Sequence, residues 1–328
     1  MNAWTFHGGR LADAQAAYGG AGDWIDLSTG INPHGWPHAD AMRIDWRRLP
    51  DERDLAMLER AAASCFGVAP AQLCAVPGTE IGLRAITGLL PGPACHLAPS
   101  YRTHAVMLGG ARPVAPEEVD GIGGGTLILA NPNNPDGRLT DCAALLARRW
   151  DAGGWLVIDE AFADPRPETS MAGQVGDDVP LVLFRSFGKF FGLAGVRLGF
   201  VIGPAPLIAG VRDRLGAWPV SAAAIAIGIA AYRDGAWIAA MRATLERESA
   251  ALDAVLRAHG FAPRGACPLF RLIETDDAAA LFDRLARRAI LTRPFDHDRR
   301  WLRIGLPAGP AALDRLDGAL GHRMPGHG

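Results

Sequence analysis

Short apolar runs that alternate with helix-like stretches constrain the fold of this chain more than any other feature. Between the apolar runs TLILA (126–130) and WLVIDE (155–160), residues 140–153 are expected to form a helix, with Thr140 as its N-cap and Gly153 as its C-terminal stop. This alternation predicts an α/β fold built on a sheet. Four runs have the length and composition of buried strands: TLILA (126–130), WLVIDE (155–160), LVLF (181–184) and LGFVIG (198–203).

Changes in residue composition and pattern along the sequence predict three parts of the chain. Residues 1–39 are rich in Gly, Pro and His, and we expect a loop-like arm that packs with the smaller domain. Residues 40–220 are expected to form a large domain. Residues 221–328 are expected to supply linking helices and a small C-terminal α/β domain.

Charge and composition exclude several classes of protein. The 33 basic and 35 acidic residues give a formal charge of −2, which argues against a general binder of nucleic acids or anionic membranes. The longest apolar tract, residues 220–231, is shorter than the roughly 20 residues that span a bilayer. No secretory signal is visible, and five scattered cysteines without a CxxC motif indicate reduced thiols and a cytoplasmic protein. We expect no metal site, because Gly35 and Pro37 prevent a helix that would pair His34 with His38.

Lys189 is the only lysine among the 33 basic residues, and it stands in the segment RSFGKFFGLAGVRLGF (185–200). Arginine keeps its proton in proteins, whereas the pKa of a lysine falls in apolar surroundings, as a Schiff-base nucleophile requires. A lysine with its stem on the core and its ammonium in water is the alternative. A nucleotide-binding P-loop is excluded, because Leu183 and Phe190 stand where that motif requires Gly and Ser or Thr.

The lysine segment is similar to that of fold-type I enzymes, the class I/II aminotransferase family, which use pyridoxal 5′-phosphate (PLP). The resemblance implies a large domain with a mostly parallel, seven-stranded sheet between helices, a smaller C-terminal α/β domain, and a homodimer. Three further segments occur in the order found in that family: PGTE (77–80), PSYRTH (99–104) and NPNNPDG (131–137).

The resemblance also implies a role for each residue of a cofactor site. Lys189 would bind the cofactor aldehyde and later move protons at the substrate Cα. Asp159, at the carboxyl end of a predicted strand, would pair with the pyridine nitrogen and keep it protonated. The other implied cofactor residues are Ser186, Arg197, Gly78, Thr79 and Glu80 around the phosphate, Asn134 at the phenolic oxygen, Tyr101 on the ring, and His104 behind Asp159.

Within this family, the sequence most resembles the L-threonine O-3-phosphate decarboxylases of cobalamin biosynthesis. The segments that carry this resemblance are HGG (7–9), DLSTGINPHGWP (26–37), RRLPD (47–51) and DEAFAD (159–164). The sister histidinol-phosphate aminotransferases typically carry tyrosines at Phe162 and near Leu49. A lyase acting on a small phosphorylated amino acid is therefore implied. An aminotransferase for a substrate such as histidinol phosphate, and a non-catalytic PLP-fold binding protein, remain alternatives.

A substrate with a carboxylate and a phosphate requires two cationic contacts. Arg303 in WLRIGLP matches the arginine that binds the substrate carboxylate in the family. Arg293 in ILTRPFD is the candidate for the substrate phosphate, and Asn32, His7 and Gly30 are candidates to complete the pocket.

Overall fold

The computed structural model describes residues 3–19 and 22–321 and divides into two compact units. The larger unit comprises residues 35–240, and the smaller unit combines residues 3–34 with residues 241–321. The domain limits expected from the sequence, after residues 39 and 220, differ from this division. Helix α9 (Ala222–Arg233) belongs to the larger unit because it packs along α3 (Glu52–Phe66).

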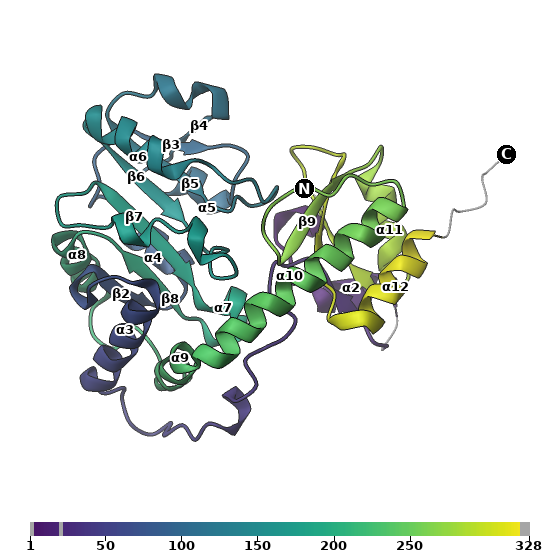
Figure 1. Cartoon of the computed structure of the whole chain (residues 1–328), viewed down its shortest axis with the longest axis horizontal. Helices are drawn as coiled ribbons and strands as arrows, with labels where there is room; N and C mark the ends of the chain where they lie inside the picture. The colour runs from purple at the N-terminus through teal and green to yellow at the C-terminus, as the bar shows by residue number, and fades with distance from the viewer. Residues whose placement is uncertain (1–2, 20–21, 322–328) are drawn as a thin grey trace. The chain divides into compact units, whose positions relative to one another are not determined.

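The larger unit is built on a seven-stranded sheet with the order β2-β8-β7-β6-β5-β3-β4 (Figure 1). Strand β8 runs antiparallel to both of its neighbours, and the other pairs are parallel. The predicted seven-stranded, mostly parallel sheet is therefore confirmed, and the four predicted strands are β5 to β8. The bounds are β2 (Leu73–Val76), β3 (Ala94–Leu97), β4 (Arg112–Val114), β5 (Gly125–Ala130), β6 (Gly154–Asp159), β7 (Leu181–Ser186) and β8 (Gly199–Ile202).

Helices pack on both faces of this sheet. On one face, Val157, Phe184 and Val201 pack in an apolar core with residues of α4 and α8 and with Met107, which follows α5. On the other face, the ring of Phe200 contacts Phe66 of α3 and Tyr232 of α9. The remaining helices of the unit are α4 (Thr79–Ala85), α5 (Arg102–Val106), α6 (Cys142–Asp151), α7 (Phe187–Phe190) and α8 (Ala205–Leu215), and α10 (Gly235–Ala258) begins in it.

Capping residues set the ends of α3 and α6. Helix α3 ends at Gly67, which adopts the left-handed conformation that glycine tolerates, with φ of 73°. The predicted N-cap Thr140 is wrong by one residue. Asp141 caps α6 instead, since its carboxylate accepts a hydrogen bond from the Ala144 amide (3.0 Å), whereas the Thr140 amide donates to Asn131 Oδ1.

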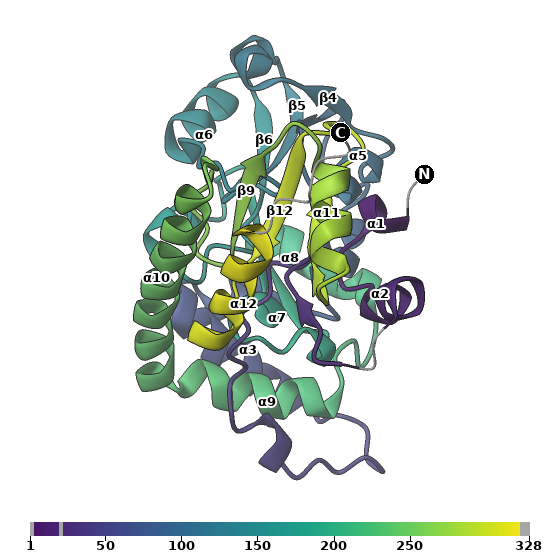
Figure 2. The same ribbon diagram turned by 90° about the vertical axis from the view of Figure 1, so that its right-hand side faces the viewer.

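The smaller unit contains a three-stranded antiparallel sheet of order β11-β12-β9. Helix α11 (Ala278–Ala286) lies against β12 (Trp301–Gly305), as Figure 2 shows. From the N-terminal segment, β1 (Ile25–Asp26) pairs in parallel with β10 (Ile290–Leu291). The other elements are α1 (Ala3–Phe6), β9 (Phe270–Glu274), β11 (Arg293–Pro294) and α12 (Gly309–Gly321).

The expectation of a loop-like N-terminal arm is wrong for residues 11–18. These residues form helix α2 (Leu11–Tyr18), whose sequence LADAQAAY is rich in alanine, the residue with the highest helix propensity. The Gly and Pro content of the N-terminal segment indicated a loop, although this stretch within it is helical.

The cysteines are free thiols, as their scattered positions in the sequence predicted. All five cysteines lie in the described part of the chain and are reduced, with Cys65 exposed and the other four buried. Burial raises the pKa of both Cys74 and Cys142 to about 12. Within residues 3–19 and 22–321, no helix is both long and apolar enough to cross a membrane.

Candidate active site

Lys189 lies on the one-turn helix α7, which follows β7 directly. Its neighbours Phe187 and Phe190 are buried, and Lys189 itself is partly buried. The Lys189 ammonium nitrogen lies 5.6 Å from the centre of the Phe162 ring, within the range of a cation–π contact. Gly188 permits the tight turn, because a Cβ there would lie 2.7 Å from Ala194 Cα. The amine is thus held among aromatic side chains.

Asp159 is the last residue of β6, at the carboxyl end of the strand. Its Oδ2 atom lies 3.3 Å from Nε2 of His104, a fully buried residue of α5, and its Oδ1 atom accepts a hydrogen bond from the Ala161 amide. Asp159 is 6% exposed, and its carboxylate is fixed from two sides. Carboxyl ends of strands are where open α/β sheets bind ligands.

Gly199 brings the predicted phosphate-binding residues together. It pairs with Ser186 of β7, and a Cβ on Gly199 would lie only 2.9 Å from the Thr79 amide nitrogen. A Cβ on Gly78 would lie 2.5 Å from Arg197 Nη2. A hydroxyl, backbone amides and a guanidinium are therefore gathered near one point. Sequence analysis missed Gly199, although a glycine inside a strand pattern indicates a close backbone approach.

Tyr101 precedes α5 and is held by Glu80. The Tyr101 hydroxyl donates to Glu80 Oε2 (3.1 Å), and Thr103 donates to the same oxygen (2.6 Å). Burial acts to raise the pKa of Glu80, but the hydrogen bonds from Thr103, Arg84 and Tyr101 outweigh it and lower that pKa overall. Glu80 is therefore ionised at neutral pH and orients Tyr101, and Thr103 is a supporting residue that the motif did not reveal.

Asn134 is partly buried on the loop that follows β5. Asp136 organises this loop, because its Oδ1 atom accepts hydrogen bonds from Asn133 Nδ2 (2.8 Å) and from the Arg138 amide (3.1 Å). Here the carboxylate closes the turn.

The predicted substrate residues lie in the smaller unit, where Arg303 is 2% exposed. Arg303 Nη2 donates to the Ser28 carbonyl (2.7 Å), and Arg293 is its partner across the β11–β12 pair. Burial, followed by the nearby Arg293 cation, lowers the pKa of Arg303 to about 9. Both influences disfavour the charged guanidinium, so a bound anion would stabilise it.

The early glycine-rich motifs pack beside this arginine. The Gly305 amide donates to the Leu27 carbonyl (2.7 Å), and the Gly9 amide donates to the Ser28 hydroxyl (2.7 Å). A Cβ on Gly8 would lie 2.3 Å from the Ser28 carbonyl oxygen. The HGG, DLSTG and WLRIG segments, far apart in sequence, are therefore in contact within the smaller unit.

The other three substrate candidates differ in exposure. Asn32 is 2% exposed, and its Oδ1 atom accepts a hydrogen bond from the His34 amide (2.9 Å). Gly30 is buried. His7 is exposed, with its ring edge-on to Phe6 at 4.5 Å.

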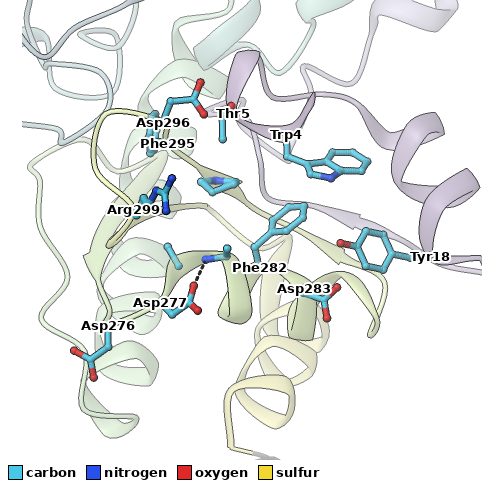
Figure 3. Close-up of a pocket in the computed structure, with 13 residues that line it drawn as sticks. Trp4, Thr5, Tyr18, Asp276, Asp277, Phe282, Asp283, Phe295, Asp296 and Arg299 are labelled. Atoms are coloured by element: carbon cyan, nitrogen blue, oxygen red, sulfur yellow. Dashed lines mark hydrogen bonds between the residues drawn. The ribbon is translucent and has the colours of Figure 1, made fainter. Parts of the chain in front are cut away.

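A cavity of about 1040 Å³ in the smaller unit is lined by aromatic and acidic side chains rather than by the predicted substrate arginines (Figure 3). Its walls include the rings of Trp4, Tyr18 and Phe282, and among the described residues four aspartates line it against one cation, Arg299. This excess of carboxylates disfavours a substrate that carries a carboxylate and a phosphate. Arg293 and Arg303 are not among the lining residues.

Comparison with known proteins places the chain in a family and supports this fold. The model of the family "Aminotransferase class I and II" matches residues 117–316. The chain therefore belongs to the class I and II aminotransferase family, as its lysine segment predicted.

The relatives define the branch of the family more closely. The chain is 41% identical to a threonine-phosphate decarboxylase from Sinorhizobium sp over 98% of each chain. It is 40% identical to a threonine-phosphate decarboxylase from Pseudomonas aeruginosa over 98% of this chain and 99% of the relative. Histidinol-phosphate aminotransferase 2 from Burkholderia mallei is 30% identical over 90% of this chain and 91% of its own.

Solved structures confirm the fold-type I prediction. L-threonine-O-3-phosphate decarboxylase from Porphyromonas gingivalis superposes with a TM-score of 0.74, at 20% identity over 90% of this chain and 97% of the other. Histidinol-phosphate aminotransferase from Sinorhizobium meliloti, in complex with pyridoxal-5'-phosphate, gives a TM-score of 0.74, at 20% identity over 94% and 93% of the two chains.

The residues present fit PLP. The cofactor requires an amine for its aldehyde, an anion for its pyridine nitrogen and donors for its phosphate. Lys189, Asp159, and the set of Ser186, Thr79 and Arg197 match these needs in one unit. The two glycines that approach Thr79 and Arg197 leave a space that a side chain would fill.

Proposed function

We propose that this chain catalyses the PLP-dependent decarboxylation of L-threonine O-3-phosphate to (R)-1-aminopropan-2-ol O-phosphate and CO2, a step of cobalamin biosynthesis. The observation that carries the proposal is the 41% identity to a threonine-phosphate decarboxylase over 98% of both chains. Histidinol-phosphate aminotransferases are more distant, at 30% identity over 90% of the chain.

The larger unit holds the reacting groups. PLP, when bound, supplies an aldehyde that takes up the substrate amine and a ring that accepts the electron pair left at Cα when CO2 departs. Lys189 would hold the aldehyde before substrate arrives and would then deliver a proton to the substrate Cα. Asp159, oriented by His104, stabilises a proton on the pyridine nitrogen. Ser186, Arg197 and the Thr79 amide would bind the phosphate, Asn134 would donate to the phenolic oxygen, and Tyr101 would stack on the ring.

The smaller unit holds the groups that bind the substrate. Arg303 binds the substrate carboxylate, and the burial that disfavours its charge makes an anionic partner strongly stabilising. Arg293 binds the substrate phosphate, with Asn32, His7 and Gly30 around it. A substrate with two anionic groups suits two adjacent guanidinium groups on one face of a strand pair.

A substrate panel tests the function. With threonine phosphate, we expect one CO2 for each amino alcohol phosphate and no 2-oxo acid. Transfer of the amino group to 2-oxoglutarate, from threonine phosphate or from histidinol phosphate, would instead establish an aminotransferase. A PLP-loaded protein inert to every phosphorylated amino acid in the panel would indicate a binding protein.

We also propose that the chain forms a homodimer. Trp46 and Leu49, on the irregular segment that precedes α3, are 76% and 66% exposed. A partner chain that covered this segment would remove both apolar side chains from water, which is favourable. Sedimentation analysis at micromolar concentration should give twice the chain mass of 34.7 kDa, and a monomer would reject this proposal.

A further inference from the structure

Arg185 is the centre of a buried cluster of charges at the carboxyl end of the sheet. It is 3% exposed, and its guanidinium donates to Glu160 Oε2 (3.1 Å), to Ser170 Oγ (3.0 Å) and to Asp164. Glu160 and Asp164 are 0% and 3% exposed. The Arg185 guanidinium also lies 4.5 Å from the centre of the Phe66 ring. Arg185 is therefore enclosed, with two carboxylates and a hydroxyl as its polar partners.

The cluster fixes the segment 160–172, which leaves β6 directly after Asp159. Glu160 accepts hydrogen bonds from the Ser170 hydroxyl (2.6 Å) and from the Met171 amide (2.7 Å), so its carboxylate ties the two ends of the segment together. Phe162, whose ring lies against Lys189, is part of this segment. Thr169 is bound at its carbonyl by Asn131 Nδ2 (3.3 Å).

Each end of the cluster adjoins a residue of the cofactor site. Arg185 immediately precedes Ser186, and Glu160 immediately follows Asp159. Asn131 stands three positions before Asn134. The ends of β5, β6 and β7 are thereby connected through side chains as well as through the sheet.

Resting on the proposed decarboxylase function, we propose that Arg185 is a positioning residue: through Glu160 and Asp164 it fixes the segment 160–172 and so sets Phe162 against Lys189. The residue acts through the segment and touches no reacting atom. A buried ion cluster of this kind often contributes little net stability, because desolvation of the charges offsets their attraction. Its contribution is the geometry that directional, charge-assisted hydrogen bonds impose.

A neutral variant separates geometry from stability. The combined substitution Glu160→Gln, Asp164→Asn and Arg185→Met removes all three charges and leaves no buried ion without a partner. We expect its urea midpoint to stay near that of the wild type. Amide hydrogen exchange over residues 160–172 in the protein without cofactor should accelerate about tenfold or more, because the segment opens locally. The kcat for CO2 release should fall at least about tenfold with little change in KM.

Arg149→Met is the matched control. Arg149 is equally buried, but it donates to the carbonyls of Ile122, Gly123 and Gly125, at the amino end of β5. This variant should unfold at lower urea, with unchanged exchange over 160–172 and unchanged kcat. Should the neutral triple variant fail to fold, Ser170→Ala removes one bridging hydroxyl and should move exchange and kcat in the same direction, about twofold to fivefold.

Three outcomes would overturn the proposal. The first is wild-type exchange over 160–172 in the folded triple variant or, if that variant does not fold, in Ser170→Ala. The second is faster exchange with wild-type kcat, and the third is an equal loss of kcat in Arg149→Met. If wild-type protein releases no CO2 from threonine phosphate, the proposed function fails separately, and exchange together with PLP affinity still tests the positioning.

Discussion

Two buried arginines on adjacent strands should respond to the same substitution with opposite changes in stability. Arg303 of β12 and Arg271 of β9 are 2% and 5% exposed. Arg303 is influenced most by burial and by the Arg293 cation, both unfavourable to its charge. Arg271 instead pairs with both carboxylate oxygens of Asp253, at 2.6 and 3.3 Å. We expect Arg303→Met to stabilise the protein and Arg271→Met to destabilise it.

The magnitude for Arg303 follows from the fall of its pKa from 12.5 to about 9. At about 1.4 kcal/mol per pKa unit, burial and the nearby Arg293 cation together cost roughly 5 kcal/mol. A guanidinium keeps its proton in proteins, so the cost lowers the stability of the folded state at every working pH. Methionine fills similar volume but loses the hydrogen bond to Ser28, about 1 kcal/mol, and the contact with the Phe270 ring, about 2 kcal/mol. The net gain is about 2 kcal/mol.

For Arg271 the sign reverses, because its removal leaves Asp253 without its bidentate partner. Loss of one member of a buried pair costs about 3 kcal/mol, and the cost is smaller here because the Asp253 side chain is 17% exposed and keeps an ion pair with Arg257 at 3.7 Å. Urea unfolding of both variants, without cofactor and at neutral pH, checks the difference. For Arg303→Met, kcat/KM for threonine phosphate should also fall roughly 100-fold, as loss of a desolvated charge pair of about 3 kcal/mol requires. A destabilised Arg303→Met would refute the reasoning, since the cation would then be stabilised where it lies.

Three further predictions follow from the site. Gly199→Ala should weaken PLP binding at least about tenfold in a spectroscopic titration, because the new Cβ would lie 2.9 Å from the Thr79 amide. The control Gly195→Ala, with no atom within 4 Å of its Cβ, should bind PLP normally. Equal PLP affinities of the two variants would reject the close approach. Borohydride reduction of the PLP complex should label one peptide, that of Lys189, and label elsewhere would contradict the assignment of the only lysine. At pH 8 a thiol reagent should modify Cys65 rapidly in the folded protein and all five cysteines after unfolding. Rapid modification of more than one cysteine in the folded protein would show that the other four are less buried than the structure places them.

Local patterns predicted much of the larger unit. Buried strands such as LVLF and LGFVIG are short apolar runs with turn signals at their ends, and β7 and β8 lie where those runs are. The helix cap at Thr140 was misplaced by one residue because two adjacent side chains can both cap. The choice of Asp141 depended on the amide of Thr140 being bound by Asn131, nine residues away in sequence.

By itself, the sequence determined the chemistry that is available: one neutralisable amine at Lys189, a carboxylate at the end of a strand, and the order of motifs around them. Only the tertiary structure decided which distant groups support that chemistry. The contacts of Gly199 with Thr79, of Tyr101 with Glu80, and of Arg185 with Glu160 and Asp164 join segments that are distant in sequence. The physical reason is that burial and hydrogen-bond partners depend on strand register and on loops returning to the sheet, which a linear pattern of residue types does not encode.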